Sequence, residues 1–286
     1  MKFSIHSSLD YVVSNPATIL CSLSCVTTEG QFVLEEKLST NREADLSEIA
    51  LGLTSNRYYV ASVNEPGDFS LNYEALVDSC PRTKGYQSVQ DSRINSLDAD
   101  TIPFLFPSRY CQSDLFRDEA SRIFGQIRGQ LATAIAVESW LKQEIEYISG
   151  ASNEGSSALE TFQNQSGVCR DFAHLGIAMC RALTIPARYV TVYAHGLTPQ
   201  DFHAVCEVYV GGQWYVMDGT GLAPLNGMVR IGTGRDASDA AVATLFGGVG
   251  GAGVSVQSDV ADSETEEFIP VFRDDLLQRD EVLYLL

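Results

Sequence analysis

Residues 203–218 read HAVCEVYVGGQWYVMD, and this stretch fixes the centre of the fold. Its residues alternate on either side of a central glycine pair, which is typical of two antiparallel strands joined by a tight turn. A two-residue turn places Glu207 opposite Val216, and it places His203 and Asp218 on one face of the hairpin. Diagonal neighbours of this kind lie about 7–8 Å apart, which a carboxylate and an imidazole can bridge. We therefore predict a hydrogen bond in which Asp218 accepts the Nδ1–H of His203.

A helix is predicted to begin at Cys169, upstream of this hairpin. Apolar residues recur at spacings of three and four residues from Phe172 to Leu183, and Ile185-Pro186 ends the pattern. Unpaired backbone N–H groups at a helix start favour a thiolate, which is the nucleophilic form of cysteine. His174 lies five residues along the same helix, about 140° around its axis, so it cannot face the thiol. Cys169 and His203 are therefore the candidate nucleophile and base.

Each of these three residues also has an ordinary structural interpretation. A cysteine at a helix start can serve only as packing, and a strand histidine can be half-buried and hydrogen-bonded. Asp218 precedes a glycine and could form a turn. Their order along the chain, with the last two on one strand face, favours catalysis.

The rest of the chain predicts an α+β protein. Short β-rich runs, with Asn15-Pro16 between the first two, predict an N-terminal β-sandwich over residues 1–100. Helical periodicity and then strand patterns follow over residues 101–250, which favours helices packed on an antiparallel sheet. The expected helices cover 123–127, 131–148 and 169–183, and the expected strands cover 187–193, 203–210 and 213–217. The glycine-rich segment 247–253 predicts a flexible linker before a C-terminal extension over 251–286.

Composition excludes several classes of protein. The 286 residues carry a net charge of −18, which disfavours nucleic-acid binding, and they include no apolar run long enough to span a bilayer. Seven cysteines without a CxxC pair favour core thiols over disulfides or a structural metal site. The polar N-terminus carries no signal-peptide pattern, so we expect a cytoplasmic protein with no membrane partner.

Four segments together resemble the transglutaminase-like superfamily, and more narrowly its bacterial members of cysteine-protease type. They are Gly167-Val168-Cys169-Arg170-Asp171-Phe172-Ala173-His174, residues 180–189, Asp201-Phe202-His203-Ala204 and Trp214-Tyr215-Val216-Met217-Asp218. The resemblance covers about residues 105–247. It implies a papain-like α+β core that cleaves or exchanges amide bonds of peptides or proteins through a thioester. Matched by motif, Cys169 is the nucleophile, His203 the general base and then acid, and Asp218 the orienting carboxylate.

We expect no cofactor and no metal, because His203 and Asp218 supply the base. The family commonly has proline after the aspartate where this chain has Gly219, so a looser strand end is expected around Asp218. The oxyanion is expected to bind the Cys169 backbone N–H and a second donor, for which Tyr110 is the candidate. Arg235, Asp236 and Asp239 could form a structural salt-bridge cluster or line a substrate groove.

Two other functions stay open. One is acyl transfer to small amines, because arylamine N-acetyltransferases share the triad order. In that family the residues immediately before the cysteine are usually Arg-Gly-Gly, whereas here they are Ser166-Gly167-Val168. The other is a non-catalytic peptide-binding module, against which all three triad positions hold competent residues.

Overall fold

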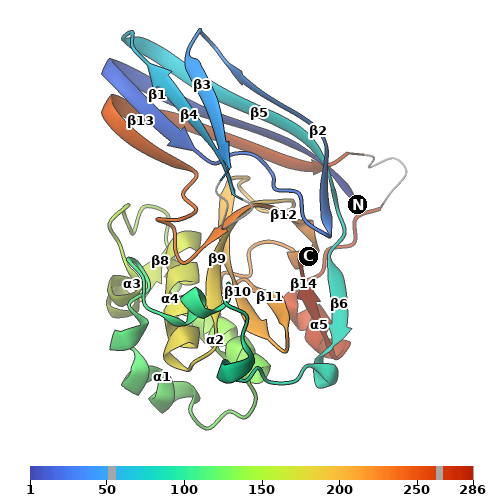
Figure 1. Cartoon of the computed structure of the whole chain (residues 1–286). Helices are drawn as coiled ribbons and strands as arrows, with labels where there is room; N and C mark the ends of the chain where they lie inside the picture. The colour runs from blue at the N-terminus through green and yellow to red at the C-terminus, as the bar shows by residue number, and fades with distance from the viewer. Residues whose placement is uncertain (51–55, 262–266, 286) are drawn as a thin grey trace.

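The computed structural model describes residues 1–50, 56–261 and 267–285, with a six-stranded N-terminal sheet packed on an α+β core (Figure 1). Six strands form the N-terminal sheet in the order β2-β5-β1-β4-β3, and the sixth, β13, pairs with β1. Their bounds are β1 Lys2–Cys21, β2 Gln31–Thr40, β3 Asp45–Ala50, β4 Arg57–Val63, β5 Gly67–Ser79 and β13 Ala243–Val260. The predicted α+β class with a strand-rich N-terminal region is confirmed.

The first strand differs from the sequence prediction because it runs through Asn15-Pro16 without ending. β1 pairs with β5 up to Val13 and with β4 from Ala17, and its register shifts between these two residues. Proline cannot donate to a strand ladder, and a bulge is a position where no such donor is required. β1 therefore links two groups of strands that the sequence would have separated.

The glycine-rich segment 247–253 is not a linker, and that prediction was wrong. It lies within β13, which pairs with β1 from Val260 opposite Phe3 to Ala243 opposite Cys21. Strand pairing uses backbone groups, so a long neighbouring strand can hold a segment with few side chains. β13 spans Ala243–Val260, so it runs across the predicted boundary between the core, which ends at residue 250, and the C-terminal extension, which begins at residue 251.

The core is built on a second antiparallel sheet in the order β11-β10-β9-β12. These strands are β9 Ala187–Ala194, β10 Phe202–Val210, β11 Gln213–Met217 and β12 Met228–Gly234. The helices are α1 Arg117–Phe124, α2 Gln130–Glu144, α3 Ala158–Asn164, α4 Cys169–Ala182 and α5 Arg273–Gln278. Short strand pairs are β6 Arg82–Gly85 with β14 Glu281–Tyr284, and β7 Glu146–Tyr147 with β8 Ser166–Gly167. Short 3₁₀ turns cover Tyr86–Ser88, Ile94–Ser96, Ile102–Leu105, Ser113–Leu115 and Leu225–Gly227.

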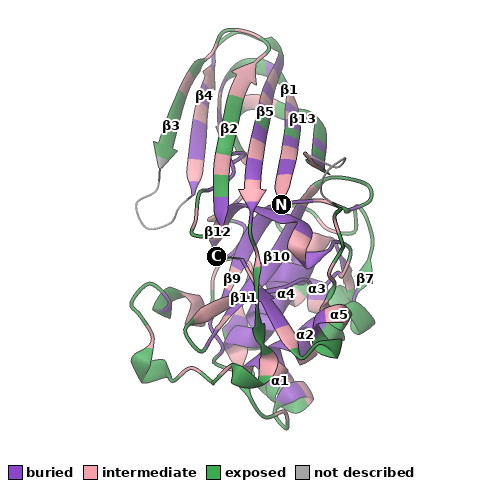
Figure 2. Ribbon diagram, turned by 90° about the vertical axis from the view of Figure 1, so that its right-hand side faces the viewer, coloured by how far each residue is buried: buried purple, intermediate pink, exposed green. Residues whose placement is uncertain are grey.

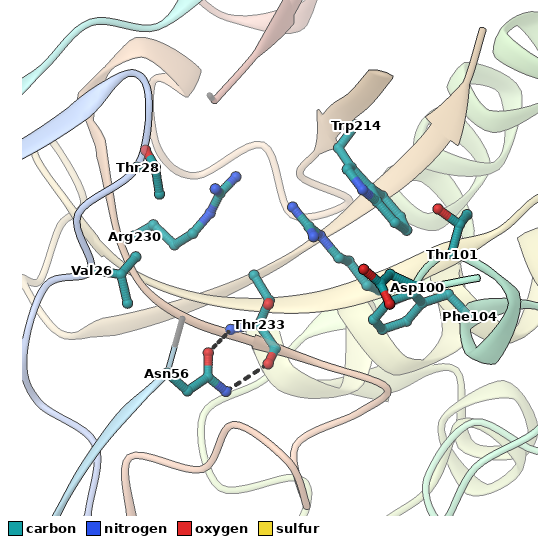
Figure 3. A pocket seen from close by; sticks show the side chains of 10 residues that line it. Val26, Thr28, Asn56, Asp100, Thr101, Phe104, Trp214, Arg230 and Thr233 are labelled. Carbon is teal, nitrogen blue, oxygen red and sulfur yellow. Dashed lines mark hydrogen bonds between the residues drawn. The ribbon is translucent and has the colours of Figure 1, made fainter. Parts of the chain in front are cut away.

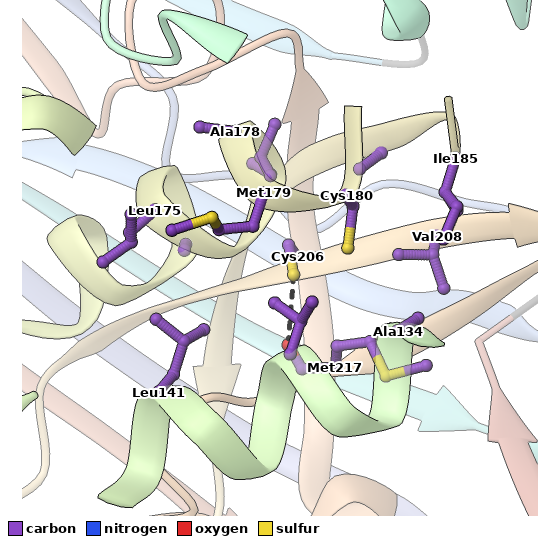
Figure 4. Close-up of a cluster of buried hydrophobic side chains, with 14 of the residues drawn as sticks. Ala134, Leu141, Leu175, Ala178, Met179, Cys180, Ile185, Cys206, Val208 and Met217 are labelled. Carbon is purple, nitrogen blue, oxygen red and sulfur yellow. Dashed lines mark hydrogen bonds between the residues drawn. The ribbon is translucent and has the colours of Figure 1, made fainter. Parts of the chain in front are cut away.

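The two faces of this core sheet are buried against different elements. Cys206 and Val208 of β10 pack with Met179 of α4 and with α2 on one face (Figure 4). Val205, which alternates with them, packs against Leu276 of α5 on the other face. The central strands are consequently buried along nearly their whole length, as the purple β9 and β10 show (Figure 2). This burial on both faces makes β10 a rigid support for His203 at its start.

The N-terminal sheet and the core share one apolar cluster. Tyr193, Val229 and Ile231 of the core are buried among side chains of β1, β4 and β5. The Tyr193 hydroxyl also donates a 2.8 Å hydrogen bond to the Leu23 carbonyl. In the described parts of the chain, no helix is long and apolar enough to cross a membrane.

Candidate active site

The predicted hairpin is present, and it brings His203 and Asp218 together. β10 and β11 pair in the predicted register, with Glu207 opposite Val216. His203 Nε2 lies 3.0 Å from Asp218 Oδ2, and the two side chains are each 1 % exposed. The bonded ring nitrogen is therefore Nε2 and not the predicted Nδ1. Asp218 therefore bonds the ring nitrogen that lies farther from the His203 backbone. The nearer nitrogen, Nδ1, can bond another group.

Asp218 is held firmly, in contrast to the looseness expected from Gly219. Its Oδ1 accepts hydrogen bonds from the Thr220 backbone N–H at 3.0 Å and hydroxyl at 2.7 Å. A Cβ on Gly219 would lie 2.8 Å from Leu141 Cδ1, so glycine lets this turn pack closely against α2. Burial alone would raise the pKa of Asp218, but the charge and hydrogen bond of His203 and the bonds from Thr220 lower it.

Cys169 occupies the first position of α4, as predicted. The residues leading to it are fixed by Asp171, whose carboxylate accepts the Val168 N–H at 2.9 Å and a hydrogen bond from Ser152. A Cβ on Gly167 would lie 2.7 Å from the Asp171 Cβ, so this approach requires glycine. Cys169 is partly exposed and Cys80 is exposed, whereas the other five cysteines, all free thiols, are buried.

His203 is the link between Cys169 and Asp218. Burial by itself would lower the pKa of His203. The Asp218 charge and hydrogen bond, together with the hydrogen bond and charge of Cys169, outweigh burial and raise that pKa to about 10. A histidine whose pKa is raised in this way keeps its proton throughout the neutral range. The site therefore favours an imidazolium next to the sulfur of Cys169.

Two residues that the sequence analysis missed support Asp218 from behind. Glu138 of α2 accepts the Asp218 backbone N–H at 2.8 Å, and Arg273 of α5 donates to Glu138 from Nε at 2.6 Å. Arg273 also donates to the Val216 carbonyl. Burial raises the pKa of Glu138, while the Arg273 charge opposes that shift. No local motif marks this pair, because 135 residues separate its members.

Tyr147 lies near Cys169, whereas the sequence pointed to Tyr110. Tyr147 is in β7 opposite Gly167 of β8, two residues before Cys169, and the charge and backbone of Cys169 both act on the pKa of its phenol. Burial and the nearby charges of Cys169 and Asp201 raise the pKa of Tyr147. The Tyr110 ring instead stacks on His174 with centroids 5.1 Å apart. The pairing of β7 with β8 is only two residues long, which gave no detectable sequence pattern.

His174 and the 235–239 segment form a structural cluster. His174 is fully buried, its Nε2 accepts the Ala237 N–H at 3.1 Å, and burial lowers its pKa to about 3. Asp236 accepts the Tyr110 N–H at 2.9 Å, and Arg235 forms an ion pair with Asp239 at 2.8 Å. These contacts favour the salt-bridge interpretation of the segment over a substrate groove.

A cavity of about 210 Å³ lies between the N-terminal sheet and the core, away from the candidate catalytic residues (Figure 3). Arg188 and Arg230 line it, and both bind the fully buried Glu207. Asp100 lines the same cavity. Its charges are therefore balanced, and none of Cys169, His203 or Asp218 is among its described lining residues.

Comparisons with known proteins identify the class. Residues 117–219 match the transglutaminase-like superfamily core, and residues 1–100 match the bacterial transglutaminase N-terminal domain. The crystal structure of a "putative cysteine protease" from Cytophaga hutchinsonii is 42 % identical, with a TM-score of 0.95 over 100 % of this chain and 98 % of that one.

A further relative is an uncharacterized protein of Mycobacterium leprae, 33 % identical over 129 residues, which are 42 % of this chain and 46 % of the relative. The chain thus spans about half the length of that relative. The chain belongs to the transglutaminase-like superfamily. Membership supports a thiol-dependent enzyme.

Proposed function

We propose that the protein cleaves or transfers amide bonds of peptide or protein substrates through a thioester on Cys169. One observation carries this proposal: a buried histidine bonds Asp218, and it lies close enough to Cys169, at a helix start, for that thiol to raise its pKa. A nucleophile, a base and a group that orients the base are the requirements of covalent acyl transfer.

The reaction follows from these positions. The Cys169 thiolate attacks the amide carbon and forms a C–S bond, and the carbonyl becomes an oxyanion beside the helix start. His203 then gives its proton to the amide nitrogen, the C–N bond breaks, and the amine leaves. Water or a second amine next attacks the thioester, and His203 accepts its proton as the C–S bond breaks. Asp218 stabilises the imidazolium in both stages.

Selective alkylation tests the nucleophile. Iodoacetamide at pH 6.5 is expected to modify Cys169 at least about tenfold faster than exposed Cys80, because a thiolate paired with imidazolium reacts where ordinary thiols stay protonated. Peptide mapping by mass spectrometry gives both rates in one sample. The buried Cys111 and Cys180 are uninformative here, since burial raises the pKa of each thiol to about 12. Equal rates at Cys169 and Cys80 would refute the assignment.

Intact mass spectrometry tests the reaction itself. Incubation with a panel of peptide amides is expected to give a thioester adduct on Cys169, and Cys169→Ala is expected to remove it. Addition of hydroxylamine should release the adduct as a hydroxamate. An adduct that persists in Cys169→Ala would assign the chemistry to another residue.

Tyr147 is proposed as the second oxyanion donor. Tyr147 pairs with Gly167, two residues before Cys169, and the Cys169 charge raises the pKa of its phenol, so the hydroxyl is near enough to donate to an oxyanion at the helix start. Tyr147→Phe is expected to lower kcat about 10–100-fold, in line with loss of one oxyanion donor, while Cys169 alkylation stays unchanged. Tyr110→Phe is the matched control, because phenylalanine keeps the stacking on His174. A loss of kcat in Tyr110→Phe alone would return the role to Tyr110.

A further inference from the structure

A second cavity, of about 370 Å³, is lined in part by the two residues that immediately precede His203. It lies between paired residues of β1 and β13 on one side and the start of β10 on the other. Its walls are largely apolar, and its described lining residues include two aspartates and no lysine or arginine. The residues used below are Leu9, Tyr11, Asp201, Phe202 and Gly251. We call this cavity the β13 groove.

The β13 groove lies at the end of β10 that carries His203. Asp201 and Phe202 line it, and they immediately precede His203 in the chain. The charges of Asp201 and Cys169 both raise the pKa of Tyr147. A chain segment seated in the groove would therefore pass close to the start of β10, where His203 lies.

Glycine at position 251 serves no evident purpose within the fold. A Cβ there would meet nothing within 4 Å, and Gly251 does not have a left-handed backbone. Glycine inside a strand commonly marks a place where another backbone or a ligand approaches closely. Gly251 lies opposite Tyr11, whose side chain is only 5 % exposed. The space over Gly251 is therefore open to a ligand and lies on the groove side of β13.

The edge of β13 offers main-chain pairing as well. Among the described strands, β13 pairs with β1 alone. An exposed edge of this kind can bind an extended peptide by adding it as another strand, with side chains entering adjacent pockets. Apolar walls at Leu9 and Phe202 suit a bulky apolar side chain, and the exposed Asp201 suits a flanking cationic one.

We propose that the β13 groove binds an extended, basic segment of the polypeptide substrate, with an apolar side chain in the cavity and lysine or arginine beside Asp201. This inference rests on the proposed function, because it names the substrate class of that site. It assigns the N-terminal sheet a direct part in substrate selection.

Peptide binding to Cys169→Ala tests the groove without turnover. The probe is a capped, fluorescein-labelled octapeptide with leucine between two lysines, and a matched peptide carries glutamates in place of the lysines. Fluorescence polarisation is expected to show at least about tenfold tighter binding of the lysine peptide. Asp201→Asn should weaken binding of the lysine peptide several-fold, as should added salt. Equal binding of both peptides, or binding of neither, would overturn the proposal.

Two glycine substitutions provide the structural control. Gly251→Val fills the groove and is expected to weaken lysine-peptide binding at least about tenfold. Gly250→Val is matched, because its Cβ also meets nothing within 4 Å, but Gly250 lies opposite the 52 % exposed Val12 and outside the groove lining. Gly250→Val should bind as the parent does. Equal losses in both variants would contradict the assignment of the groove.

Failure of the groove and failure of the proposed function give different results. Iodoacetamide is too small to need the groove, so Gly251→Val in the chain with Cys169 intact should keep its fast alkylation of Cys169. Fast alkylation without peptide binding would reject the groove alone. Selective peptide binding without fast alkylation would reject the proposed chemistry and support the groove.

Discussion

His203→Ala is expected to lower kcat on a reactive peptide amide by about 10³–10⁴-fold, the upper range for loss of a general acid–base. Cys169 then loses its only described imidazole partner, so its fast alkylation at pH 6.5 should fall as well. Steady-state kinetics and alkylation on the same preparation separate the two effects. A variant that loses turnover but keeps fast alkylation would show that His203 does not activate the thiol.

Asp218→Asn is expected to lower turnover less than His203→Ala does, because it keeps the imidazole. The amide removes the charge that stabilises imidazolium, and it can present a donor where Nε2–H needs an acceptor. The corresponding change costs about 10⁴-fold in serine proteases. We expect about 10–10³-fold here, because cysteine is already partly ionised without help.

Glu207→Gln is the control on the same strand. Glu207 is fully buried between Arg188 and Arg230, so its replacement should lower the free energy of unfolding while the folded protein keeps its turnover. Loss of turnover in Glu207→Gln, with Asp218→Asn at the parent rate, would mean that the orienting residue is misassigned.

The sequence predicted those parts of the site that depend on local patterns. The hairpin register follows from alternation and a two-residue turn, and the start of α4 follows from its apolar spacing and the turn before it. The nitrogen of His203 that meets Asp218 could not be predicted, because it depends on the ring orientation and not on strand parity. In the same way, the fully buried position of Glu207 depends on Arg188 from β9 and Arg230 from β12.

Long-range contacts account for what the sequence analysis missed. Residues 247–253 have the glycine-rich composition of a linker, and only pairing along β1 makes this segment a strand. Arg273 lies in a segment with no recognisable pattern, yet it meets Glu138 behind Asp218. Tyr147 reaches Cys169 through two residues of parallel pairing. In each case the partner is supplied by another part of the chain, which periodicity within one segment cannot reveal.

Arg273→Met is expected to lower the free energy of unfolding by about 3–5 kcal/mol, as is typical when one member of a buried ion pair is removed. The Arg273 and Glu138 side chains are 11 % and 6 % exposed, so the variant leaves the Glu138 carboxylate buried without its counter-charge. Urea denaturation followed by tryptophan fluorescence measures the loss. Turnover should fall too, because Glu138 holds the Asp218 backbone N–H at 2.8 Å.

The pH dependence of the stability loss and a double variant distinguish the unpaired Glu138 charge from lost packing as its cause. Burial already raises the pKa of Glu138, and removal of Arg273 takes away an interaction that lowers it. In Arg273→Met the folded state therefore binds a proton more readily than the unfolded state, so the loss of stability should be larger at pH 8 than at pH 5. Glu138→Gln keeps an acceptor for Asp218 without the charge, so Arg273→Met combined with Glu138→Gln should regain much of the lost stability. A loss that is equal at both pH values, and additive in the double variant, would mean that Arg273 acts by packing and not by neutralising the carboxylate that supports Asp218.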